Sequence, residues 1–164
     1  PELVRSLILV ATGSGGPDRV PRPRHIAAAV DEALLLPLEE FARRTIDLGL
    51  SPAWPERNPE RFEEIVATQI DQPTPYELLE SHAAACYRFY DEDCAVERID
   101  APALVVHGDL DVIVPVQNGR ALARRLRSCR YVELAGRGHN LMLEDPATLV
   151  RLVEKFLAHE ARAA

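Results

Sequence analysis

The chain has 164 residues, 47% of them hydrophobic, which is enough to bury the core of one or two small domains. Its 26 acidic residues outnumber 19 lysines and arginines, and the net charge of -7 excludes the basic surface that binds nucleic acid or an anionic membrane. No apolar run approaches the ~18 residues that a membrane-spanning helix needs. The three cysteines form no CxxC pair, which argues against a zinc site or disulfide framework and favours a reducing cytoplasm.

The first predicted element is a strand at residues 6–12 (SLILVAT). Its unbroken hydrophobicity is typical of a strand buried on both faces of a parallel sheet. Gly13, Gly15 and Gly16 end the strand, and three prolines follow by position 23. Because proline cannot stand inside a helix, no helix is expected before about residue 24.

The middle of the chain has the pattern of helices. Helices are expected at residues 25–36 and 38–48, after Asn58-Pro59 as cap and first turn, and from Tyr76 onward. The last of these aligns Leu79, Ala83, Cys86 and Tyr90 as an apolar stripe. We therefore expect an all-helical insert over residues 18–94, with Trp54 in a loop between two of its helices.

The last third returns to alternating strands and helices. Strands are expected at residues 103–107 and 130–134, a helix at 116–127, a loop at 135–145, and a final helix capped by Asp145-Pro146. This alternation predicts an α/β fold of about three parallel strands with flanking helices, joined by right-handed crossovers and carrying the helical insertion.

Two loops of this region contain side chains suited to catalysis. The sequence HGDLDVIVP (His107–Pro115) follows one strand, and GRGHNLMLEDP (Gly136–Pro146) follows the next. Since parallel strands end at the same edge of a sheet, Asp111 and His139 are expected to lie close together. A carboxylate that accepts the Nδ1–H of an imidazole fixes the tautomer that acts as a general base.

The spacing of these motifs resembles the acid and histidine loops of the α/β-hydrolase superfamily. The acid loop has the pattern G-x-x-D-x-x-V-P, and a helix, a strand and G-H-x4-E-x-P follow it. The opening PELVRSLILVATG resembles the strand after that family's nucleophile helix. The resemblance implies a core at residues 1–17 and 95–164, a lid at 18–94, Asp111 as triad acid and His139 as triad base. It implies no metal and no organic cofactor.

Other residues compete for some of these roles. Asp109 is the alternative acid, but the family places the acid three residues after the glycine, which favours Asp111. Ser14, in TGSGG, is the candidate for the nucleophile, which in the family sits on a G-x-S-x-G turn that leads directly into a helix. Because the glycines and prolines after Ser14 prevent that helix, we interpret Ser14 as part of a substrate-facing loop. The other histidines (His25, His82, His107 and His159) are interpreted as ordinary surface or core residues.

The sequence also suggests a substrate pocket and indicates that part of the sheet and the nucleophile are missing from this chain. Trp54 is the candidate wall of an apolar pocket for a small-molecule acyl substrate. A sheet of only three parallel strands would expose an unpaired apolar edge. We therefore expect a missing N-terminal half or a second chain to complete the sheet and to supply the nucleophile.

These observations favour a hydrolase of a small ester, lactone or related acyl compound. Two alternatives remain from the sequence: a non-catalytic binding or assembly protein with this fold, and a dehalogenase or epoxide hydrolase with an aspartate nucleophile. A third possibility is that Ser14 makes the chain a minimal hydrolase by itself.

Overall fold

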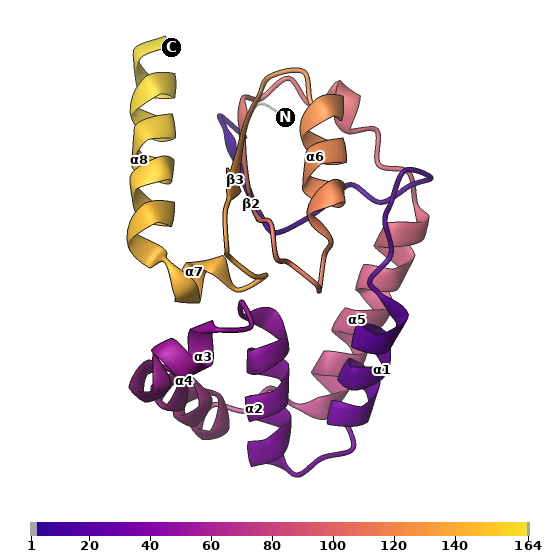
Figure 1. Cartoon of the computed structure of the whole chain (residues 1–164). Helices are drawn as coiled ribbons and strands as arrows, with labels where there is room; N and C mark the ends of the chain where they lie inside the picture. The colour runs from indigo at the N-terminus through magenta and orange to yellow at the C-terminus, as the bar shows by residue number, and fades with distance from the viewer. Residues whose placement is uncertain (1–2, 164) are drawn as a thin grey trace.

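The computed structural model describes residues 3–163 and contains a parallel sheet with the strand order β1-β2-β3 (Figure 1). The strands are β1 (Leu7–Val10), β2 (Ala103–Gly108) and β3 (Cys129–Leu134). In register, Ala103 of the central strand pairs with Leu7 on one side and with Cys129 on the other. The predicted α/β class with three parallel strands is confirmed.

The helices lie on both faces of the sheet and in the segment between β1 and β2. They are α1 (Arg24–Ala33), α2 (Leu38–Gly49), α3 (Trp54–Arg57), α4 (Pro59–Asp71), α5 (Tyr76–Asp91), the 3-10 turn η1 (Val96–Arg98), α6 (Val116–Arg125), α7 (Leu141–Glu144) and α8 (Pro146–Ala163). The sheet separates α6 on one side from α8 on the other, while α2–α4 lie next to α7 at one end of the sheet and α1 and α5 lie farther from α7, on the side of α6 (Figure 1).

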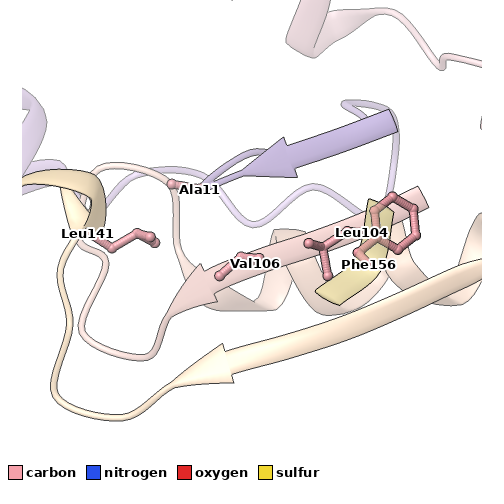
Figure 2. Packing of buried hydrophobic residues seen from close by; sticks show 5 residues of the cluster. All are labelled: Ala11, Leu104, Val106, Leu141 and Phe156. Carbon is pink, nitrogen blue, oxygen red and sulfur yellow. The ribbon is translucent and has the colours of Figure 1, made fainter. Parts of the chain in front are cut away.

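Alternate residues of β2 build the two halves of the core, because successive side chains of a strand point to opposite faces. Leu104 and Val106 pack against Phe156 of α8 (Figure 2). Val105 points the other way and packs with Leu122 of α6. All six residues of β2 are buried, so the strand that leads into the acid loop is held rigidly from both sides.

The prediction that the first strand is buried on both faces was wrong. Ile8 of β1 is 39% exposed, and the strand is only partly buried along its length. The physical reason is its position, since β1 pairs with β2 on one side and forms the edge of the described sheet. The exposed apolar edge that the sequence predicted is therefore present.

The helical insert, residues 18–94, has its own apolar core. Ala42, Ile46 and Leu50 of α2 and the following turn pack against Phe62 and Val66 of α4. The predicted apolar stripe of α5 is not buried, because Ala83 is exposed and no residue of this helix is fully covered within the described structure.

Three local details differ from the sequence prediction. Trp54 begins the short helix α3 instead of lying in a loop, and α7 forms inside the expected loop 135–145. Asn58 precedes α4 but makes no capping hydrogen bond with its side chain; its Nδ2 instead donates to the carbonyl oxygen of Trp54 at 3.0 Å. The predicted cap at Asp145 is confirmed, since its Oδ1 accepts the N–H of Thr148 at 3.1 Å.

Candidate active site

The acid loop leaves the end of β2 and folds around the carboxylate of Asp111. One oxygen, Oδ1, accepts the backbone N–H groups of Ile113 at 2.9 Å and Val114 at 2.8 Å. The Asp111 side chain has no solvent exposure. These bonds fix the carboxylate to its own loop and leave the second oxygen, Oδ2, facing the histidine loop that follows β3.

His139 meets that second oxygen. The distance from His139 Nδ1 to Asp111 Oδ2 is 2.9 Å. Because an ionised carboxylate can only accept, Nδ1 carries the ring hydrogen, and Nε2 is left with its lone pair. Among residues 3–163 no hydrogen bond reaches Nε2, and the His139 side chain is 28% exposed. The prediction that the two side chains lie in hydrogen-bonding reach is confirmed, and the ring presents an Nε2 lone pair that can accept a proton.

The surroundings of Asp111 favour its ionised form. Burial acts to raise its pKa, but hydrogen bonds from His107, His139 and the N–H of Val114 outweigh burial and lower the pKa below its usual value of 3.8. A carboxylate that is ionised near neutral pH stabilises, from its place next to Nδ1, the imidazolium that forms when Nε2 takes up a proton.

His107 is a contact of this site that the sequence did not reveal. Its ring is fully buried at the end of β2, with Nε2 2.8 Å from the carbonyl oxygen of Val114 and 3.1 Å from Asp111 Oδ2. Since both neighbours are acceptors, Nε2 carries the hydrogen, and buried Nδ1 has no partner. A Cβ at Gly119 of α6 would overlap the imidazole, so only glycine lets the helix approach this closely. In the sequence, the position of His107 could have indicated this contact, because the residue lies near the end of a buried strand, four residues before Asp111.

The competing acid has a different role. Asp109 is exposed, and its Oδ1 accepts the N–H of Gly136 at 2.6 Å. This bond joins the acid loop to the start of the histidine loop. Asp111, and not Asp109, therefore contacts the imidazole, as the family spacing predicted.

The two other predicted site residues lie elsewhere. Ser14 is 6% exposed and its Oγ accepts a hydrogen bond from Arg125 Nη1 at 3.2 Å. Trp54 is half-buried and packs against the core of the helical insert. Within the described residues neither is hydrogen-bonded to Asp111 or His139, and the pocket roles of both stay predictions.

A small cavity lies between the helical insert and the acid loop. Its volume is about 110 Å³, and its lining includes Arg19 and Tyr90 of the insert and Val114 and Asn118 of the core, but not His139. Burial, the first of several influences, raises the pKa of the Tyr90 hydroxyl. That hydroxyl therefore stays protonated near neutral pH and can donate to a polar ligand.

Residues 3–163 contain neither a metal-binding cluster nor a membrane-spanning helix. That part of the chain has no cluster of three or more His, Cys, Asp or Glu side chains able to hold a metal ion. None of its helices combines the length and the apolar character needed to cross a membrane.

Known proteins resemble the chain over much of its length. Over 57 residues it is 40% identical to Esterase LipC of Mycobacterium tuberculosis, an alignment that covers 32% of this chain and 14% of that protein. An enol-lactonase from Burkholderia xenovorans is 22% identical, with a TM-score of 0.70 over 94% of this chain and 55% of that one. A thermophilic esterase from Thermogutta terrifontis is 21% identical, with a TM-score of 0.68 over 95% and 56%.

The chain thus spans little more than half the length of these solved structures, and the structural likenesses show the fold alone. A model of the alpha/beta hydrolase family matches residues 2–152, which includes β1, the helical insert, the acid loop and the histidine loop. With a match over nearly its whole length, the chain belongs to the alpha/beta hydrolase family.

Proposed function

We propose that the protein is a serine hydrolase that cleaves a small ester, lactone or related acyl compound, with Asp111 and His139 as two members of its triad. The observation that carries this proposal is the 2.9 Å contact between Asp111 Oδ2 and His139 Nδ1, which leaves Nε2 of the partly exposed ring without a hydrogen bond among residues 3–163. The esterase relative supports the substrate class.

The proposed reaction uses Nε2 of His139 twice. It first removes the proton from a serine hydroxyl while the serine oxygen attacks the acyl carbon, and Asp111 stabilises the resulting imidazolium. The imidazolium then gives its proton to the leaving alkoxide, and an acyl-enzyme remains. A water molecule, deprotonated by the same nitrogen, attacks the acyl-enzyme, and the proton returns to the serine as the acid is released.

The serine itself belongs to sequence outside these 164 residues in this proposal. Ser14 does not serve, because its hydroxyl is occupied by Arg125 and the segment after it, up to Pro23, forms no helix. A preceding segment or a second chain would pair with the exposed edge of β1 and bring the nucleophile and oxyanion hole to His139.

The helical insert would act as a lid over the substrate. The cavity between the insert and the acid loop supports this, because residues of both the insert and the core line it. The protein would work in the reducing cytoplasm, a location supported by free Cys86, Cys94 and Cys129.

A serine-directed fluorophosphonate probe tests the proposal on the chain together with the preceding segment or second chain that would complete its sheet, called the complete protein below. We expect one labelled serine, and labelling slowed at least about 1,000-fold by His139→Ala. The matched control is His159→Ala, which removes an exposed histidine from α8.

Two outcomes would contradict the proposal. No labelling of the complete wild-type protein would favour an aspartate nucleophile or a non-catalytic binding protein. Labelling of Ser14 in the 164-residue chain alone would show that the chain is a minimal hydrolase.

A further inference from the structure

The backbone that carries His139 is tied to the helical insert through Glu144. Its Oε1 accepts the N–H of Gly138 at 2.8 Å and the N–H of Ser51 at 2.9 Å. Its Oε2 accepts the hydroxyl of Ser51 at 2.7 Å. One carboxylate therefore joins the residue just before the histidine to the segment that follows α2.

A second bond ties the other side of the histidine to the same segment. The N–H of Asn140 donates to the carbonyl oxygen of Gly49 at 2.7 Å. A Cβ on Gly138 would stand 2.7 Å from the carbonyl carbon of Leu50 and 2.8 Å from the nitrogen of Ser51. The two backbones are thus in direct contact, and only glycine fits between them.

This contact is part of a packed interface. Leu50 is 4% exposed and Ser51 is 9% exposed. Leu143, one residue before Glu144, packs against the apolar core of the insert that includes Leu50. The segment 49–51 and the loop 138–144 consequently behave as one packed unit, in which the carboxylate supplies the acceptors for buried N–H groups.

We propose that Glu144 is a positioning residue that couples the placement of the helical insert to the orientation of His139. Asp111 holds the ring through Nδ1, whereas Glu144 and Gly49 hold the backbone from which the ring extends. Movement of the insert at residues 49–51 is thereby transmitted to the imidazole. This inference rests on the function proposed above for His139.

The expected loss of kcat follows from how far His139 would be displaced. A displacement of a catalytic group by about 1 Å can cost roughly 100-fold in rate. Loss of the hydrogen bonds to the Glu144 carboxylate should therefore lower kcat. It should leave KM nearly unchanged, because Glu144 does not line the described cavity beside the acid loop.

Two variants of Glu144 separate positioning from charge. Glu144→Ala removes all three acceptor contacts, and we expect kcat of the complete protein to fall about 10- to 100-fold, with KM within about threefold. Glu144→Gln keeps one oxygen for the two backbone N–H groups, and its amide can donate to the Ser51 hydroxyl, which rotates to accept. We expect Glu144→Gln to retain kcat within about threefold. Glu154→Ala, at an exposed position on α8, is the matched control.

NMR tests the effect of the Glu144 hydrogen bonds on His139 without relying on hydrolysis. Glu144→Ala should speed amide hydrogen exchange at Gly138, Asn140 and Ser51, and should replace the single Nδ1–H tautomer of His139 by a mixture in nitrogen NMR. Ser51→Ala, which removes only the hydroxyl, should produce a smaller change of the same kind and serves if Glu144→Ala fails to fold.

The inference is overturned if Glu144→Ala, or Ser51→Ala in its place, speeds exchange but leaves kcat and the His139 tautomer unchanged. It is also overturned if Glu144→Gln is as impaired as Glu144→Ala. Absence of hydrolysis in the wild-type protein would instead contradict the proposed function, and the NMR comparison would still decide whether Glu144 positions His139.

Discussion

Two regions of the molecule differ in how far their side chains are buried. One is the rim, formed by the ends of β2 and β3, and the other is the region formed by β1 and α5. At the rim, every residue of β2 is buried, and Asp111 is bonded to its own loop and to His139. In the other region, Ile8 is 39% exposed, and large apolar residues of α5, such as Tyr87 at 56%, face solvent.

The difference shows which functions these residues perform by themselves. At the rim, Asp111 finds its hydrogen-bond partners in its own loop, in His107 and in His139, so the described residues by themselves place the acid beside the base. The edge of β1 and the surface of α5 have apolar area and unpaired strand groups that other polypeptide would cover. The comparison supports the proposal that the nucleophile comes from a segment or chain on the β1 side.

The largest effect is expected at the rim. Asp111→Asn replaces a carboxylate by an amide that no longer selects the Nδ1–H tautomer of His139. In the complete protein we expect kcat to fall by about 10⁴-fold, measured with a chromogenic ester. Asp109→Asn is the matched control, because Asp109 contacts Gly136 and not the imidazole. Equal losses from both variants would contradict the assignment of the acid.

A second comparison sets the central strand against the edge strand. Leu104 is fully buried against α8, so Leu104→Ala should lower the free energy of unfolding by about 2–5 kcal/mol. Ile8→Ala, on the neighbouring strand, should cost less than about 1.5 kcal/mol because the side chain is already partly in water. Urea unfolding measures both values. Similar losses would mean that β1 is covered in solution by something the described residues do not contain.

A substitution next to His107 should cause a smaller loss of stability. Gly119→Ala places a Cβ against the buried imidazole and should cost about 1–3 kcal/mol of stability. This outweighs the gain of up to about 1 kcal/mol that alanine brings to a helix. Gln117→Ala, at an exposed position of α6, is the control in the same thermal unfolding experiment. A stabilised Gly119→Ala variant would show that His107 does not press against this helix.

The lowered pKa of Asp111 predicts a pH dependence of stability. Its contribution is fully present above the unfolded pKa, near the usual value of 3.8, and is lost as the pH falls through the lower folded value. The stability gap between wild type and Asp111→Asn should therefore narrow from pH 7 to pH 3, as measured by urea midpoints. A gap of constant size would mean that the folded pKa is not lowered.

The smallest effect on folding is expected at the exposed edge. Ile8→Lys places a charge on the edge strand, where a long side chain reaches water, and should change the free energy of unfolding by at most about 0.5 kcal/mol. The unpaired apolar edge of β1 predicts that the 164-residue chain self-associates, and the same substitution should reduce this association in sedimentation. Unchanged association would mean that another surface mediates self-association, and the exposed face of α5 would be the next surface to test.

Local patterns made much of the fold and the acid–base pair predictable. Unbroken apolar runs mark β1 and most of β2, and the spacing of Gly108, Asp111, Gly138 and His139 places the acid and base on adjacent strand ends. Contacts between distant segments were not predictable from such patterns. The bonds from Ser51 to Glu144 join residues 93 positions apart, and neither residue marks the other in the sequence.

The central claim is that Asp111 holds His139 with its hydrogen on Nδ1 and Nε2 free to accept a proton. Nitrogen NMR of histidine-labelled protein near neutral pH measures this directly. The account predicts a protonated Nδ1 and a bare Nε2 for His139, and a mixture of tautomers in Asp111→Asn. A wild-type ring protonated on Nε2, or a tautomer ratio unaffected by Asp111→Asn, would contradict it.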